Sequence, residues 1–143
     1  MTATDRALEL IRTAAAAADE RSGFDLVGLD VSENMPLTDA FLLVSGRNER
    51  MVLSIADEVE ERLRVEHGQK ALRREGLQLG RWVLLDFGDI VVHVFHEEDR
   101  LFYGLERIWR DAPVIDLQLD ANEQAVAQDA SGSAGQAEGD ATA

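Results

Sequence analysis

Two segments of the chain place their hydrophobic residues at helical spacing. The first covers residues 5–18, where Thr4 and Asp5 are suited to cap the helix start. The second begins at Asn48, another capping residue, and continues to about Glu66. The apolar stripes consist of Leu8, Ile11, Ala14, Ala15 and Ala18 in the first segment, and of Val52, Ile55, Ala56, Val59 and Leu63 in the second. The pattern predicts two amphipathic helices that pack on a common core.

Short apolar runs between these helices predict buried strands. Residues 24–31 lie between Gly23 and Ser32, and residues 40–44 end at a Ser-Gly pair. A further short strand is expected near 71–74.

Two longer apolar runs, 82–87 and 90–95, flank the pair Gly88-Asp89, which favours a tight hairpin turn. Placing Phe87 opposite Ile90 fixes the register. Side chains alternate across strands, so one face of the hairpin collects Val83, Leu85, Phe87, Ile90, Val92 and Val94, and the other collects Trp82, Leu84, Asp86, Val91, His93 and Phe95. The first face is a core face. The second is mixed in character, so it is either half-covered by a helix or exposed for a partner.

A last helix is expected over residues 100–110, with Leu101, Leu105 and Ile108 on its inner stripe. The order helix, two strands, helix, strand, hairpin and helix predicts a single α/β domain. Its mixed sheet would contain about five strands, flanked by helices.

Length and composition agree with one domain and separate it from a tail. The chain has 143 residues and no cysteine, which excludes disulfides and thiolate chemistry. Residues 118–143 hold eight alanines, five acids and no base or aromatic residue, so we expect a disordered acidic tail after a domain at 1–117. The N-terminus lacks signal-peptide features and no apolar run could span a membrane, so we expect a soluble cytoplasmic protein.

The charge balance restricts the partners. The net charge is −14, and residues 1–117 alone carry 23 acidic and 14 basic residues, a net of −9. Such a surface opposes direct nucleic-acid binding and suits a basic protein partner.

The sequence contains no recognisable combination of catalytic residues. His93 and His96 lie near several carboxylates, but a separation of three along a strand points their side chains to opposite faces, so a structural role is favoured over a metal site. A minor hypothesis remains a metal-dependent nucleotidyl-transfer enzyme that uses Asp86, Asp89 and His93. We therefore assign no cofactor, no metal ligand and no catalytic residue.

Two long segments resemble a known family. They are GRWVLLDFGDIVVHVF at 80–95 and RLFYGLERIW at 100–109, with LTDAF at 37–41 and Ser45-Gly46 upstream. Together they resemble the signature of the Iojap/RsfS family, the ribosomal silencing factors, over about residues 5–117. The segment after Ser45-Gly46, Arg47-Asn48-Glu49-Arg50-Met51, departs from the family pattern.

The resemblance implies a fold similar to a minimal nucleotidyltransferase domain without its catalytic motifs. It implies a non-enzymatic repressor that binds the large ribosomal subunit through its fourteenth ribosomal protein. Such a repressor blocks joining of the small subunit under nutrient limitation, and family members form homodimers. A role mainly in assembly of the large subunit stays open, because it would need the same docking surface.

The partner-binding residues expected from the mixed face and the signature are of two kinds. Three would act as apolar anchors and two would meet basic groups: the anchors are Trp82, Tyr103 and Trp109, and the acids are Asp86 and Glu106. A core role for Trp82 and Trp109 is the alternative.

Overall fold

The computed structural model describes residues 2–119, without the side chains of residues 101–103, and from position 120 onward the predicted tail lies outside the described residues. The elements are α1 (Asp5–Glu20), β1 (Phe24–Asp30), β2 (Ala40–Gly46), α2 (Glu49–His67), β3 (Arg73–Glu75), β4 (Trp82–Asp86), β5 (Ile90–His96), α3 (Glu97–Tyr103), α4 (Leu105–Ile108) and β6 (Val114–Ile115). The six strands form one mixed sheet in the order β3-β4-β5-β2-β1-β6, in which only the β2–β5 pair is parallel among the described strands. The α/β class predicted from the sequence is confirmed.

The two long helices begin at the predicted caps. The Thr4 hydroxyl accepts a hydrogen bond from the backbone N–H of Ala7, and the Asn48 side chain accepts one from Met51. The buried face of α1 is wider than the predicted stripe, because this helix packs against both the sheet and α2. Leu10, which the stripe left out, is therefore fully buried, whereas Leu8 is only partly buried.

The β4–β5 hairpin has the predicted register. The backbone N–H of Phe87 donates to the carbonyl of Ile90 over 2.9 Å, and Trp82 lies opposite Phe95. Gly88 makes the turn with φ of 89°, a conformation that residues with a Cβ rarely adopt. All six residues of the predicted core face are buried: Val83, Leu85, Phe87, Ile90, Val92 and Val94.

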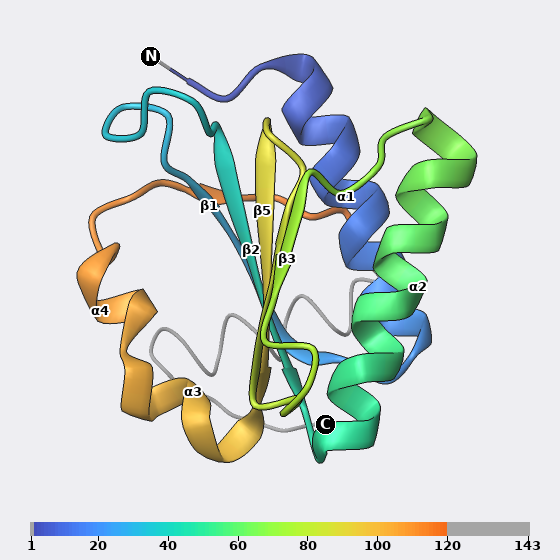
Figure 1. Ribbon diagram of the computed structural model, residues 1–143. Helices are drawn as coiled ribbons and strands as arrows, with labels where there is room; N and C mark the ends of the chain where they lie inside the picture. The colour runs from blue at the N-terminus through green and yellow to red at the C-terminus, as the bar shows by residue number, and fades with distance from the viewer. Residues whose placement is uncertain (1, 120–143) are drawn as a thin grey trace.

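The two faces of the sheet are covered by different elements (Figure 1). Helices α1 and α2 lie side by side on one face and enclose the larger hydrophobic core. On the other face α3 and α4 cover a smaller cluster built from β1, β2 and β5. None of the described helices is long and apolar enough to cross a membrane.

The C-terminal part of the domain differs from the prediction. The single helix expected over 100–110 is wrong: Gly104, with φ of 65°, ends α3, and the four-residue α4 follows in a new direction. Because of this break, Ile108 points to solvent and is 69% exposed instead of lying on an inner stripe. Strand β6, which the sequence analysis missed, spans two residues, too few for a period to show.

Candidate protein-docking surface

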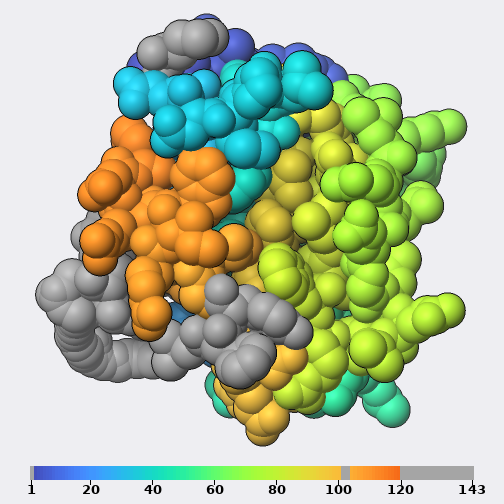
Figure 2. Space-filling view, turned by 60° about the vertical axis from the view of Figure 1, so that its left-hand side comes forward, coloured from blue at the N-terminus to red at the C-terminus, as the bar shows by residue number. Residues whose placement is uncertain are grey.

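One part of the sheet is left without a helix. On the side of α3 and α4, the outward residues of β4, namely Trp82, Leu84 and Asp86, are only partly buried. The register of the β3–β4 pair places Glu75 opposite Leu84 and Arg73 opposite Asp86, so all five side chains share this face. We call these five residues the open face. Figure 2 shows the surface of β3, β4 and β5, in yellow-green to yellow, beside the orange segment that contains α4.

The sequence left open whether this face is half-covered or exposed, and the structure shows both conditions side by side. The β5 residues Val91, His93 and Phe95 are buried, whereas their neighbours on β4 are not. The boundary between covered and uncovered sheet therefore runs between β5 and β4.

Trp82 lies at this boundary, and residues of β5 hold its side chain in place. Its ring stacks on Phe95 with centroids 5.3 Å apart, and its indole Nε1–H donates a hydrogen bond to Nδ1 of His93 over 3.1 Å. The indole thus has one face and its donor committed inside the domain, while part of its surface remains accessible.

His93 is a neutral histidine inside an aromatic cluster. It is 4% exposed and contacts the rings of Phe41, Trp82 and Phe95. Burial lowers the pKa of His93 to about 4, because the charged imidazolium is disfavoured in this apolar site. Since an indole nitrogen can only donate, Nδ1 is the acceptor and the remaining proton sits on Nε2. That Nε2 atom is buried without a hydrogen-bond partner, the one such side-chain atom found among the described residues.

Asp86 combines a turn contact with partial exposure. Its Oδ1 accepts from the backbone N–H of Gly88 over 2.9 Å, which supports the hairpin turn. Its Oδ2 lies 3.9 Å from the guanidinium of Arg73. The side chain is 28% exposed, so it stays within reach of a basic group.

Glu106 is bound within the domain. Both of its carboxylate oxygens accept from the Arg100 guanidinium, over 3.0 and 3.1 Å. Arg100 is itself buried and donates through its third nitrogen to the Ser45 hydroxyl over 2.8 Å. The network ties α3, α4 and the end of β2 together. Glu106 is still 44% exposed at its side chain, so it can also face a partner.

The other two predicted anchors, Trp109 and Tyr103, differ in what the structure shows of them. Trp109 caps the end of α4 and meets Phe41 edge to face, with ring centroids 5.3 Å apart, which makes it a partly buried member of the smaller cluster. Tyr103 is the last residue of α3, and its side chain lies outside the described residues.

The three residues of the minor enzymatic hypothesis do not form a common site. Asp86 supports the turn, Asp89 lies 3.9 Å from Arg6, and His93 is buried against aromatic rings. His96 instead caps α3, its Nδ1 accepting from the backbone of Glu98. In residues 2–119, with the exceptions given above, no group of three or more His, Asp or Glu is placed to hold a metal ion.

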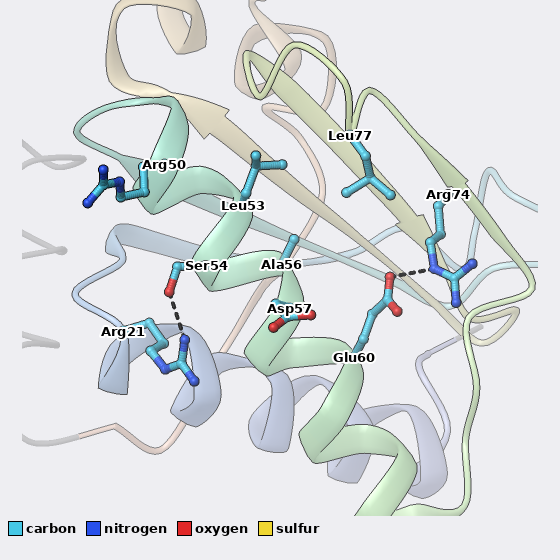
Figure 3. Close-up of a pocket in the computed structure, with 9 residues that line it drawn as sticks. All are labelled: Arg21, Arg50, Leu53, Ser54, Ala56, Asp57, Glu60, Arg74 and Leu77. Atoms are coloured by element: carbon cyan, nitrogen blue, oxygen red, sulfur yellow. Dashed lines mark hydrogen bonds and ion pairs between the residues drawn. The ribbon is translucent and has the colours of Figure 1, made fainter.

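A shallow hollow of about 630 Å³ lies across the sheet from the open face, beside α2 (Figure 3). Leu53 and Leu77 border it, and its basic groups are mostly paired with acids or hydroxyls of the same wall. Arg21 binds Ser54, and Arg74 binds Glu60. Because the guanidinium groups of Arg21 and Arg74 already bind groups of the protein, they are only partly available to a ligand in the hollow.

The polar pairs behind the open face were partly visible in the sequence. The alternation of side chains placed Trp82 and His93 on the same face of the hairpin, and this is the signal for their contact. The bond between Arg100 and Glu106 was missed, because it depends on the chain reversal at Gly104.

These features define a small α/β domain with one closed face and one partly open, aromatic and acidic face, which is typical of a protein that binds another protein. The model of the family "Ribosomal silencing factor during starvation" matches residues 4–142, farther along the chain than the resemblance at 5–117. The chain belongs to this family, RsfS.

Individual relatives agree with that assignment. The chain is 39% identical over 114 residues to ribosomal silencing factor RsfS of Bacillus subtilis, which covers 80% of this chain and 96% of the relative. A 43-residue stretch is 49% identical to the chloroplastic protein Iojap of Zea mays, covering 30% of this chain and 19% of that protein. A crystal structure from Bacillus halodurans has a TM-score of 0.66 at 37% identity and covers 76% of this chain and 97% of its own. A crystal structure from Chromobacterium violaceum has a TM-score of 0.68 at 31% identity, with coverages of 79% and 92%.

Proposed function

We propose that this protein represses translation by binding the large ribosomal subunit through its fourteenth ribosomal protein and keeping the small subunit from joining. The mechanism is steric and involves no chemistry on a substrate. Membership of the ribosomal silencing factor family is the observation that carries the proposal. The open face supports it by supplying a surface on which a protein partner can dock.

The open face has the composition of a docking site. Trp82 and Leu84 provide a central apolar area, and Trp109 extends it along α4. Asp86 and Glu75 lie at the rim with Arg73, and Glu106 adds a carboxylate from α4. We assign the aromatic residues, with Tyr103, as anchors and Asp86 and Glu106 as contacts for basic groups of the partner.

Charge supports a protein partner embedded in RNA. The net charge of −14 repels the phosphates of the ribosome, while a basic ribosomal protein attracts the same surface. The two effects together restrict the chain to protein-rich patches of the subunit.

Sedimentation with separated subunits tests the proposal. The purified protein should pellet with large subunits and remain in the supernatant with small subunits. Increasing amounts of protein should then lower the fraction of joined ribosomes. Pelleting with neither subunit, or binding to large subunits without any loss of joining, would contradict the proposal.

We further infer that two free copies pair through the same open face, because this face exposes apolar area that water disfavours. Light scattering after size-exclusion chromatography should give twice the mass of one chain. Leu84→Lys should give a single-chain mass, and a wild-type monomer at all concentrations would contradict the inference.

A further inference from the structure

The hydrogen bond between Trp82 and His93 is unusual for its position. It lies at the boundary of the open face, yet its acceptor belongs to one of the most buried polar side chains of the domain. The other ring nitrogen of His93 has no partner. A buried donor without a partner destabilises a fold, and an apolar side chain in its place would avoid that penalty.

His93 cannot itself touch a partner, because its free nitrogen has no accessible surface. Three aromatic rings contact its imidazole, namely those of Phe41, Phe95 and Trp82. Of these, Trp82 alone reaches the open face. Leu84 also lies opposite His93 on β4, but Trp82 is the open-face residue that binds an imidazole nitrogen of His93, so an effect of that nitrogen on docking passes through Trp82.

The hydrogen bond adds a restraint on the indole that stacking alone does not give. The indole stacks on Phe95 with 24° between the two ring planes, and stacking by itself does not determine which edge of the indole faces inward. Donation from Nε1 to Nδ1 of His93 holds the Nε1 edge of the indole toward β5. An anchor that is already oriented loses less entropy on binding.

We infer that His93 is a positioning residue, which sets the orientation of the Trp82 indole on the open face and thereby the affinity of this face for its partner. The inference about affinity rests on the proposed function, whereas the inference about orientation does not.

Two substitutions whose side chains have the same number of heavy atoms and the same branching separate positioning from packing. His93→Asn keeps an oxygen close to the place of Nδ1 and can still accept from Trp82, and His93→Leu cannot. Both lose the imidazole ring. Leu adds no buried polar group, so we expect His93→Leu to unfold at the higher urea concentration of the two. Binding to large subunits should rank in the opposite order, with His93→Leu at least tenfold weaker than His93→Asn. A purely structural role would give the same order in both measurements.

Leu43→Val serves as a matched control. Leu43 lies beside His93 on the neighbouring strand, belongs to the same buried cluster and is fully buried, so its side chain is not available to a partner. This variant should lose stability and retain binding.

Fluorescence decides the orientation without ribosomes. In a Trp109→Phe background Trp82 is the single tryptophan, and His93→Leu should make its emission more accessible to acrylamide, while His93→Asn should not. Equal quenching in both variants overturns the inference, and so does a released indole with unchanged binding. If the wild-type chain binds no subunit, the proposed function fails, and the quenching result still decides whether His93 orients Trp82.

Discussion

The two faces of the sheet are built on different principles. The face under α1 and α2 is lined by aliphatic side chains, alanines and Phe87, all of them almost wholly buried. The face under α3 and α4 contains aromatic rings, a neutral histidine and a buried arginine, and it is covered over only part of its width. The first face stabilises the fold mainly through burial of apolar area. The second combines partial burial with specific polar contacts, as expected if this surface also binds the partner that we propose.

We expect the largest difference in stability between substitutions at two adjacent residues of β4. Leu85 is fully buried on the closed face, and Leu84 is partly buried on the open face. Leu85→Ala should lower the free energy of unfolding by about 3 kcal/mol, because it leaves a cavity, and Leu84→Ala by about 1 kcal/mol or less. Urea unfolding of both variants measures the difference. Equal losses would show that the two faces contribute alike to stability.

Acid should weaken the second face through His93. Its pKa is about 4 in the folded protein and near 6.5 in the unfolded chain, so the unfolded chain takes up a proton first as the pH falls. Stability is complete above pH 6.5, declines between 6.5 and 4, and changes no further from this group below 4. The decline amounts to about 3 kcal/mol.

The other acidic groups titrate in the same range, so His93→Leu is the control. The stability of the wild type relative to this variant should fall by that amount between pH 7 and pH 4. A constant difference across this range would show that His93 is not buried in its neutral form.

Glu106 should contribute more to the free energy of unfolding than an acid whose ion pair is fully on the surface. Glu106→Ala leaves the buried Arg100 guanidinium without its carboxylate, and we expect a loss of about 2 kcal/mol. Glu61→Ala removes the exposed pair with Arg64 and should change stability by less than about 0.5 kcal/mol. Thermal or urea unfolding compares them. Similar small losses would mean that the network of Arg100 does not hold α4 in place.

Removal of residues 120–143 should have the smallest effect. This segment has no aromatic residue and no base, so it supplies no anchor, whereas Leu117 and Leu119 pack on the core and are retained. Binding to large subunits should stay within tenfold, equivalent to about 1.4 kcal/mol. A larger loss would show that docking extends beyond the two faces of the sheet.

Sequence alternation predicted the closed face well because burial there follows from local period alone. The register at Phe87 and Ile90, the caps at Thr4 and Asn48, and the core face of the hairpin are all confirmed. These features need no knowledge of distant contacts.

For the open face, the sequence predicted which residues of β4 share it but not how much of it is covered. Its coverage depends on where the chain turns after α3, and a positive φ at Gly104 gives no period in the sequence. The pairing of Arg100 with Glu106 follows from that turn and was equally hidden. Trp82, Asp86, Tyr103, Glu106 and Trp109 therefore remain predictions as partner contacts, although the structure places Trp82 and Asp86 on the open face.

The most direct measurement compares one charge placed on each side of the sheet. Leu84→Lys puts a positive charge on the open face, and Val65→Lys puts one on the solvent side of α2, where Val65 is 62% exposed. Both folded variants are sedimented with large ribosomal subunits. We predict that Leu84→Lys stays in the supernatant and that Val65→Lys pellets like the wild type. Pelleting of Leu84→Lys at wild-type levels, or equal loss of both variants, would contradict docking through the open face.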